Sequence, residues 1–328
     1  MLQNKKLLSN AKNLLAFSAG GDSTALLFLL LEENISFDIA IVDYAVRPQS
    51  KDEVRYAKAL AKRYNFKCHL LNASKISSNF EANARTIRYE YFNSLIKEHK
   101  YSNLLTAHHL GDRFEWMLMQ FCKGAGCPEL TGMKAVEHRE SYTLLRPLLH
   151  LEKSELLEYL NAKEINYFED ESNWDKKYKR NEFRHNYSSP LLSKYLSGIK
   201  KSFEYLDEDT KELIQELKIE KINEFAYIKP SSNRRSNIFA IDKYLKSKQH
   251  MMSANERKLL TESEVVVIGR KFVIAQTDSY IFITPFLEAR GMSKEFKEEM
   301  RLLKIEPKLR AYFFLDSEAV EFVSLLLQ

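Results

Sequence analysis

The first half of the chain alternates short apolar segments with longer amphipathic ones, and this alternation constrains the fold more than any other feature. The apolar segments have the length of buried strands, and the amphipathic segments have helical periodicity. In order along the chain, the predicted strands and helices are residues 13–18, 24–33, 37–44, 50–64, 67–72, 81–99, 103–107 and 112–123. Strands that alternate with helices are joined by right-handed crossovers. The sequence therefore predicts an α/β fold with a parallel, doubly wound, Rossmann-like sheet, whose ligands bind beyond the carboxyl ends of the strands.

The second half of the chain has a different pattern, and 328 residues are more than one ordinary domain contains. Helical patterns run from about residue 191 to residue 217, and residues 229–237 form a basic, turn-rich stretch typical of a linker. Strand-like runs follow between residues 264 and 283. We therefore expect a first domain over residues 1–200 and a smaller C-terminal α+β domain over residues 201–328.

The loop of residues 18–24 (SAGGDST) lies between the first predicted strand and the first predicted helix. Gly20 and Gly21 let the backbone N–H groups approach an anion closely, and the helix N-terminus adds partial positive charge. The carboxylate of Asp22 suits a phosphate site only if a divalent cation lies between them. An ordinary strand-to-helix turn with a capping residue explains the same loop about equally well.

The same loop resembles the SGGxDS signature of the PP-loop ATP pyrophosphatases, with Ser18, Gly20, Asp22 and Ser23 matching. Ala19 replaces the first glycine of the signature, which predicts a negative φ at that residue. Further segments resemble elements of the tRNA(Ile)-lysidine synthetases within that family, in the family's order. These segments are residues 42–50, 79–89, 106–115, 145–149, 169–173 and 179–184.

Several positions depart from those elements, and each departure marks a place to examine. Tyr44 stands where the family has histidine, and Gly111, Arg113 and Trp116 depart from its AHHxxDQxET segment. Six ordered matches are specific, although any one of them alone is not. A further segment, residues 304–314, resembles the family's C-terminal region more weakly.

The resemblance implies ATP and Mg²⁺ at the loop and an amino-acid pocket beside it. For ATP it assigns Ser18, Ala19, Gly20, Gly21, Asp22 and Ser23, with Asp22 also holding Mg²⁺. For L-lysine it assigns Arg88, Asp112 and Glu115, and for catalysis Asp22, His108 and Arg184. For tRNA or phosphate contacts it assigns Arg180, Arg184, Arg234 and Arg235. Carboxylates suit the lysine ammonium groups because an ammonium donates hydrogen bonds and accepts none.

Simpler explanations stand beside these roles. Asp112 and Glu115 also fit a capped helix with a solvated acidic face, and Arg85 and Arg88 fit a surface helix whose aliphatic stems cover apolar neighbours. Exposed basic runs are commonly only solvated. His109 fits packing or turn structure better than chemistry, although the roles of the adjacent His108 and His109 are interchangeable at this stage. The residue that acts as general base stays open between His108 and a carboxylate.

The resemblance implies ligation of L-lysine to C2 of the wobble cytidine in an isoleucine tRNA with a CAU anticodon. ATP first adenylates the cytidine oxygen and releases pyrophosphate, and the lysine ε-amine then displaces AMP. Two other functions fit parts of the sequence: a tRNA thiolase of the same family, and a non-catalytic RNA-binding protein on a nucleotide-binding scaffold. The thiolase fits less well because thiolases generally need suitably placed cysteines or an iron–sulfur cluster.

Composition excludes several other classes of protein. The chain has no apolar run of about 18 residues and no secretion leader, so we expect a cytoplasmic protein with no membrane partner. Its three cysteines, Cys68, Cys122 and Cys127, form no CxxC pair and indicate a reducing compartment. A net charge of +5 permits a polyanionic partner. Nothing in the sequence indicates an oligomeric state.

Overall fold

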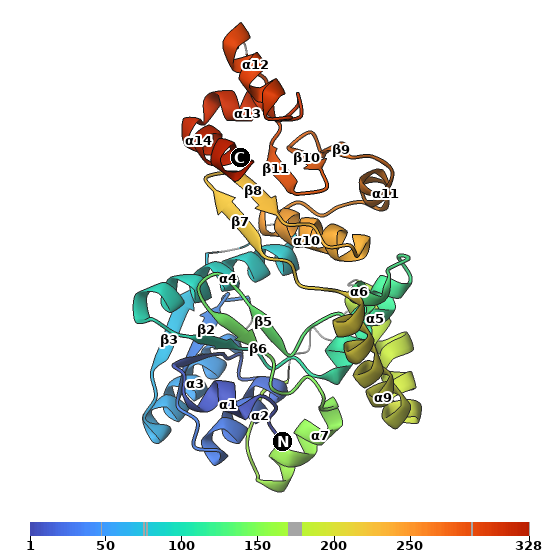
Figure 1. Ribbon diagram of the computed structural model, residues 1–328. Coiled ribbons are helices and arrows are strands. Elements are labelled where there is room, and N and C mark those ends of the chain that lie inside the picture. The colour runs from blue at the N-terminus through green and yellow to red at the C-terminus, as the bar shows by residue number, and fades with distance from the viewer. Residues whose placement is uncertain (47, 75, 77, 170–178, 290, 328) are drawn as a thin grey trace. The chain divides into compact units, whose positions relative to one another are not determined.

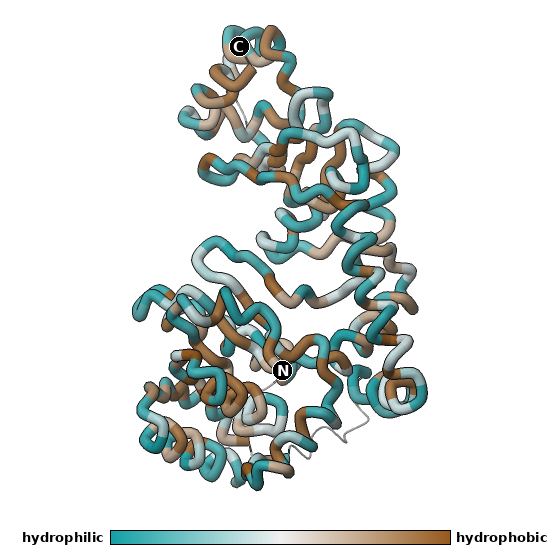
Figure 2. The backbone as a smooth tube through the Cα atoms, turned by 60° about the horizontal axis from the view of Figure 1, so that its bottom comes forward, coloured by the Kyte–Doolittle hydropathy of each residue, from teal (hydrophilic) through white to brown (hydrophobic). Residues whose placement is uncertain are grey.

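A computed structural model describes residues 1–46, 48–74, 76, 78–169, 179–289 and 291–327. The chain divides into two compact units, Met1–Asp207 and Glu208–Gln328 (Figure 1). The division falls within helix α9 (Ser189–Leu213), which has a kink at Tyr195. In each unit the hydrophobic segments gather in the interior and the hydrophilic segments lie outside (Figure 2).

The first unit contains the predicted α/β sheet, with two strands that the sequence patterns did not indicate. Its six strands have the order β3-β2-β1-β4-β6-β5, and all are parallel except β5 at the edge. The strands are β1 (Asn13–Ala16), β2 (Phe37–Asp43), β3 (Cys68–Asn72), β4 (Asn103–Leu105), β5 (Val136–His138) and β6 (Thr143–Leu145). The last two strands have only three residues each, too short for a periodicity to be recognised; β4 is equally short, but it lies inside the longer predicted strand of residues 103–107.

Helices cover both faces of this sheet, as a doubly wound fold requires (Figure 1). The side chains of successive residues of β1 point to opposite faces of the sheet, because side chains alternate along a strand. Leu15 packs against α2 (Gly21–Glu32), α3 (Ser50–Tyr64) and α7 (Lys153–Ala162), whereas Leu14 packs against α4 (Phe80–His99). The sheet is therefore buried on both sides, and its edges and strand ends remain for ligands.

The strand order reverses direction at β1. The chain passes from β1 outward to β2 and β3, and then returns to place β4 on the other side of β1. In open α/β sheets the crevice at such a reversal, beyond the carboxyl ends of the two strands, is where ligands bind. The loops after β1 and β4 both end at this crevice, and they lead into α2 and α5 (Leu110–Phe121).

The second unit is an antiparallel five-stranded sheet with helices on both faces. The strand order is β7-β8-β11-β10-β9. Its elements are β7 (Ile219–Ile222), β8 (Phe225–Ile228), α10 (Arg234–Ser247), α11 (Ala254–Glu262), β9 (Val265–Ile268), β10 (Phe272–Gln276), β11 (Ile281–Pro285), α12 (Lys294–Leu302), α13 (Arg310–Leu315) and α14 (Ser317–Leu326). α10 and α11 share one core with the sheet, and α12 to α14 share the other.

The prediction that residues 229–237 form a linker is wrong. This stretch joins β8 to α10 inside the second unit, and its second half is the first turn of α10. Asn233 caps the helix by accepting hydrogen bonds from the N–H groups of Arg235 and Ser236, and Ser236 is fully buried. Capping residues and turn residues are the same residue types, so composition alone did not separate a cap from a linker.

The remaining elements of the first unit are short helices and one irregular helical segment. They are α1 (Lys5–Ser9), α6 (Cys127–Leu130), α8 (Lys179–Phe183) and the π-helical turn η2 (Arg184–Ser188), which runs directly into α9. Within the described residues, no helix has the combined length and apolar character needed to cross a membrane.

Candidate active site

The loop after β1 folds back on the first turn of α2 through its two serines. The Ser23 hydroxyl donates to the Gly20 carbonyl at 3.1 Å, and it accepts from the Ser18 N–H at 3.2 Å. The two hydroxyl oxygens are 3.1 Å apart. These bonds fix the loop at the N-terminus of α2, where unpaired helix N–H groups and the helix dipole favour an anion.

Ala19 is the residue of this loop with unusual backbone geometry, and the prediction of a negative φ there is wrong. Its φ is +62°, whereas Gly20 has a φ of −73°. The Ala19 carbonyl accepts a hydrogen bond from the Phe168 N–H at 2.9 Å, and Gly20 forms a bridge with Phe168. These contacts hold the loop in a shape that requires left-handed geometry, at a cost of about 1–2 kcal/mol for alanine.

Gly21 is needed for space and not for backbone freedom. It opens α2 in helical geometry, and a Cβ atom placed on it would lie 2.9 Å from Leu157 Cδ2. Real Cβ atoms do not approach other carbons so closely, so a larger residue would require at least the Leu157 side chain to shift.

Asp22 has a buried carboxylate oxygen that nothing neutralises. Its Oδ1 atom accepts no hydrogen bond from any residue that the structure describes, and its Oδ2 atom is 3.8 Å from His109 Nε2. A buried carboxylate oxygen without a partner is costly, and Mg²⁺ is bound through one or two carboxylates together with phosphates. The residues present at this position therefore fit a divalent cation.

His109 connects this loop to the segment after β4. It is the N-cap residue of α5, and its Nδ1 accepts from the Gly111 N–H at 3.0 Å. In the neutral ring the proton is therefore on Nε2, which lies 3.8 Å from Asp22 Oδ2 and 3.6 Å from Asp112 Oδ2. The sequence favoured packing or turn structure for His109. It does cap a helix, but it also stands between the two carboxylates.

His108 lies beside these groups in a half-buried position. Its Nδ1 is 2.9 Å from the Thr106 hydroxyl. Burial lowers the pKa of His108 to about 4, and the charges of Arg146, Arg180 and Arg85 act in the same direction, while Asp112 opposes them. The ring is therefore neutral at pH 7 and is able to accept a proton.

Asp112 and Glu115 do not lie open for a ligand, because two arginines occupy them. Asp112 Oδ1 accepts from Arg180 Nη2 at 3.0 Å and from Arg184 Nη2 at 3.2 Å. Glu115, which is 1% exposed, accepts from Arg184 Nε at 2.9 Å and also from Arg180 Nε. We call these four residues the carboxylate–arginine network. It joins the predicted lysine pocket to the predicted phosphate contacts.

The network is electrostatically balanced. Burial alone raises the pKa of Asp112, but its interactions with His109, His108, Arg180 and Arg184 outweigh burial and hold that pKa well below its usual value. Burial also lowers the pKa of Arg180, and Asp112 and Glu115 more than restore it. The Asp112 carboxylate and the Arg180 guanidinium therefore stay charged together near neutral pH.

Arg113, one of the departures from the family pattern, has a structural role. Its guanidinium donates to Asp207 on α9 through Nη1 at 3.0 Å and through Nη2 at 2.5 Å, and it lies 4.3 Å from the centre of the Phe203 ring. Arg113 thereby fastens α9 to α5 while its neighbour Asp112 faces the network.

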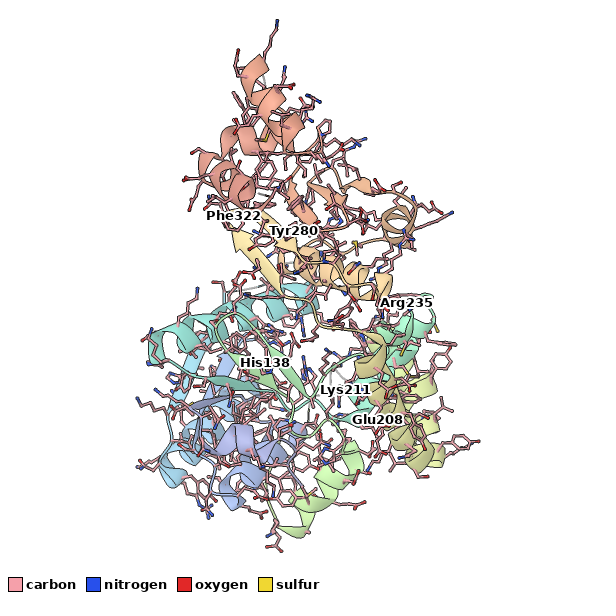
Figure 3. All side chains as sticks on the ribbon, viewed as in Figure 1. His138, Glu208, Lys211, Arg235, Tyr280 and Phe322 are labelled. Carbon is pink, nitrogen blue, oxygen red and sulfur yellow. The ribbon has the colours of Figure 1, made fainter. Side chains whose placement is uncertain are left out.

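Other predicted residues lie elsewhere. Arg88 is exposed on α4, and its charge opposes the rise that burial causes in the pKa of Tyr44. Tyr44 donates to the Ala84 carbonyl at 2.8 Å, which ties the end of β2 to α4. Arg234 and Arg235 are exposed at the start of α10 in the second unit, and Figure 3 labels Arg235. Residues 170–173 of the predicted 169–173 element lie outside the described residues.

Comparison with known proteins identifies the class first. Residues 1–190 match the family model of the PP-loop domain. The fold is also similar to that of a U34-tRNA thiolase from Methanococcus maripaludis with its [4Fe-4S] cluster, at a TM-score of 0.54 and 19% sequence identity. That match covers 66% of this chain and 78% of the thiolase, and it is evidence for the fold alone.

Relatives that match nearly the whole chain identify the family within this class. A tRNA(Ile)-lysidine synthase from Helicobacter pylori is 42% identical over 94% of this chain and 90% of its own length. Another, from Wolinella succinogenes, is 43% identical over 96% of both chains, and one from Campylobacter jejuni is 41% identical over 94% of both. The chain therefore belongs to the PP-loop proteins and, among them, to the tRNA(Ile)-lysidine synthase family.

Proposed function

We propose that this protein ligates L-lysine to C2 of the wobble cytidine in an isoleucine tRNA with a CAU anticodon, using ATP. Family membership supports the activity. The observation in the site that carries the proposal is the juxtaposition at His109, whose Nε2 lies 3.8 Å from Asp22 of the loop suited to phosphate and 3.6 Å from Asp112, one of the two carboxylates suited to an amine. The alternative thiolase activity has no relative of comparable identity and coverage among those described above.

In the first step the loop binds ATP, and the cytidine O2 attacks the α-phosphorus. Pyrophosphate leaves, and the base becomes an O2-adenylated cytidine. Gly20 and Gly21 let the phosphates approach the N-terminus of α2, and the exposed Ser18 hydroxyl of the same loop is a further hydrogen-bond donor. Mg²⁺ held by the unpaired Oδ1 of Asp22 supplies charge neutralisation for the phosphates.

In the second step the ε-amine of lysine attacks C2, and AMP leaves. We propose that Asp112 and Glu115 pair with an ammonium group of the amino acid, and that Arg180 and Arg184 pair with its carboxylate or with a phosphate. A zwitterionic amino acid therefore meets partners for both of its charges in the carboxylate–arginine network. Binding requires an exchange of partners, because each protein charge already has one.

We propose His108 as the group that accepts the proton from the attacking amine. It is neutral at pH 7, as a base must be. A pKa of about 4 makes it a weak base in the free protein, but the negative charge of a bound nucleotide raises the pKa of a nearby imidazole. The carboxylate of Asp112 is the poorer candidate because its pKa is held low by the surrounding positive charges.

We propose the second unit, residues 208–328, as a tRNA-binding domain. A tRNA is far larger than the crevice above one sheet, so binding needs charged surface at a distance from the reaction. Arg234 and Arg235, both exposed at the start of α10, supply phosphate contacts (Figure 3). Such contacts position the RNA without reading its sequence, and they make affinity dependent on salt. We expect the protein to act in the cytoplasm, where tRNA is modified.

Release of AMP tests the activity. Purified protein is incubated with ATP, Mg²⁺, tRNA and lysine, and each is omitted in turn. We expect full AMP release only when both tRNA and lysine are present. A thiolase would release AMP without lysine when a sulfur donor is supplied, and a non-catalytic RNA-binding protein would release none under any condition.

The tRNA contacts are tested separately in the full chain with Arg234→Ala and Arg235→Ala. We expect the double variant to bind tRNA more weakly. We also expect the logarithm of its association constant to fall less steeply with the logarithm of salt concentration, by about 1–2 in slope. Arg301→Ala on α12 is the matched control, since Arg301 is also an exposed arginine of the second unit and is paired with Glu298. An unchanged slope in the double variant contradicts the assignment of these two arginines.

A further inference from the structure

Four large apolar or aromatic side chains lie at or near the surface of the segment that runs from α8 into α9: Phe183, Tyr187, Leu191 and Tyr195. Tyr187 is 48% exposed, Leu191 37% and Tyr195 60%. Phe183 is half-buried, and its ring centre lies 5.3 Å from that of Tyr187. We call these four residues the aromatic row. A soluble protein rarely leaves a contiguous apolar strip uncovered without an interaction to make there.

The four residues are spaced four apart in the sequence, which is the spacing of one face of a helix. Tyr187, Leu191 and Tyr195 each stand one position before a residue that faces the core: Ser188, Leu192 and Leu196. Residues spaced four apart lie one above another on a helix. The row therefore runs alongside the buried seam by which α9 packs on α5, and it is not part of that seam.

The backbone under the row departs from a regular helix at two places. In η2 the Ser189 N–H donates to the Arg184 carbonyl, five residues back, and Pro190 follows immediately. Proline has no N–H and clashes with the carbonyl four residues before it, which the wider π turn relieves. A second departure occurs at Tyr195, with φ −129° and ψ 26°.

The π turn connects the row to the active site. Arg184 begins η2 and reaches Asp112 and Glu115, while Tyr187, three residues later in the same turn, faces solvent. A ligand on the row therefore lies within one turn of a side chain in the carboxylate–arginine network. Single π turns inside α-helices frequently occur at functional sites.

Charge indicates what kind of ligand fits. Residues 179–201 contain six lysines and arginines and one glutamate. Four of these cations contact carboxylates, namely Arg180, Arg184, Lys200 and Lys201. Lys194 is exposed, and in the sequence it stands three residues after Leu191 and directly before Tyr195. Aromatic side chains interleaved with basic residues are the composition of surfaces that bind unpaired nucleotides by stacking.

The second unit contains another partly exposed aromatic cluster, and it fits RNA less well. Tyr227 lies 6.1 Å from Tyr280 and 5.3 Å from Phe322, centre to centre (Figure 3). Charges of both signs act on this cluster, because Glu220 and Lys218 influence Tyr227 in opposite directions and Glu321 adjoins Phe322. The cluster therefore lacks the excess of cations that residues 179–201 have.

We propose that the aromatic row is a stacking platform for unpaired bases of the tRNA, next to the base that reacts. The inference rests on the proposed function, because it takes tRNA as the ligand. Tyr187 and Tyr195 stack with bases that the loop of the RNA leaves unpaired, and Leu191 fills the space between them. Stacking tolerates any base, so the platform holds the loop open and adds affinity without reading sequence.

The test uses the full chain and an isoleucine tRNA transcript, with binding measured in the absence of lysine. We expect Tyr187→Ala and Tyr195→Ala each to raise Kd by about 5-fold or more, since base stacking on an aromatic side chain is worth that much or more. Tyr187→Phe and Tyr195→Phe keep the ring and should bind within about twofold of the unaltered chain. The salt slope should not change, because no phosphate contact is removed.

Tyr205→Ala is the matched control, since Tyr205 is an exposed tyrosine of the same helix, 55% exposed, and lies outside the row. Unfolding temperatures of all variants exclude loss of fold as the cause. Two results overturn the proposal: alanine variants that bind like the unaltered chain, or phenylalanine variants that bind as poorly as the alanine variants.

A protein occupant gives a different result. If the row seats a second copy of this chain, sedimentation equilibrium shows an oligomer that Tyr187→Ala disrupts while tRNA affinity is unchanged, and the proposal fails. Failure of the proposed function is distinguishable, because it appears as absence of lysine-dependent AMP release in the unaltered chain, whatever the binding variants show.

Discussion

The two sides of the active site satisfy their charges in opposite ways. In the loop after β1, the Asp22 carboxylate has a buried oxygen with no partner among the described residues, and Ala19 is held in an unfavourable backbone conformation. In the carboxylate–arginine network, every oxygen of Asp112 and Glu115 has a partner within the protein.

This difference teaches what a ligand must do at each side. A ligand of the loop completes interactions that folding leaves incomplete, so that binding there relieves a cost that the free protein carries. A ligand of the network has to take over partners that the protein already has, so that binding there is an exchange. Removing a charge should therefore harm function alone at the loop, but function and stability together at the network.

The largest effect should come from Asp22→Ala. We expect AMP formation to fall by about 10²–10³-fold or more, because the charge that holds a cation beside the phosphates is lost. The free energy of unfolding should stay the same or rise, because an unpaired buried oxygen is removed. AMP release and thermal unfolding measure the two quantities. Glu33→Gln, at the other end of α2, is the control, and near-normal turnover in Asp22→Ala would remove the loop from the mechanism.

Glu115→Gln should be the contrasting case. We expect kcat/KM for lysine to fall by about tenfold or more while the KM for ATP changes little, since only a charged carboxylate compensates an ammonium in a dehydrated pocket. The free energy of unfolding should fall by about 2 kcal/mol, because Arg180 and Arg184 lose a buried partner.

Kinetics with lysine and ATP varied separately, together with denaturant unfolding, test this variant. Asp112→Asn should behave in the same way. Unchanged lysine kinetics in both variants would refute the pocket. A stable Glu115→Gln protein would show that the network does not contribute to stability.

The pH dependence of stability should depend on His108. Its pKa is about 4 in the folded protein and near 6.5 in an unfolded chain, so the unfolded state binds the proton first as pH falls. Stability is therefore fully present above pH 6.5 and declines between pH 6.5 and 4, by about 2 kcal/mol for this half-buried ring.

His108→Asn keeps a hydrogen-bonding group near Thr106 and removes the titration. Unfolding by denaturant at several pH values should show a flatter profile for this variant. Burial also lowers the pKa of His69, which contributes with the same sign, so the difference between the two profiles is the quantity to compare. Parallel profiles would mean that His108 titrates normally.

The smallest effect should come from Ala19→Gly. Glycine adopts a φ of +62° without penalty, but it also adds entropy to the unfolded chain, so we expect a net stabilisation of about 0.5–1 kcal/mol. Activity should be unchanged. Ala25→Gly, inside α2, is the control with the opposite sign, because glycine destabilises a regular helix. A loss of stability in Ala19→Gly would show that the loop is not strained.

Much of the fold was predictable because local patterns repeat at a length that periodicity resolves. The strands β1 to β3 and the helices between them are longer than the three residues of β5 and β6, which the sequence did not indicate. The strand β4 also has only three residues, but it lies inside the longer predicted strand of residues 103–107. The linker assigned to residues 229–237 failed for a related reason, since the first turn of a capped helix and a loop share their residue types.

By itself, the sequence determined the parallel sheet, the phosphate loop and the identity of its family, because these depend on residue types at fixed local spacing. Only the tertiary structure placed His109 between Asp22 and Asp112, gave Ala19 its positive φ through Phe168, and paired Asp112 and Glu115 with Arg180 and Arg184. Apart from the local contact between His109 and Asp112, each of these contacts joins segments that are distant in the chain. Which charges neutralise one another is decided by distance in space, and a sequence records only distance along the chain.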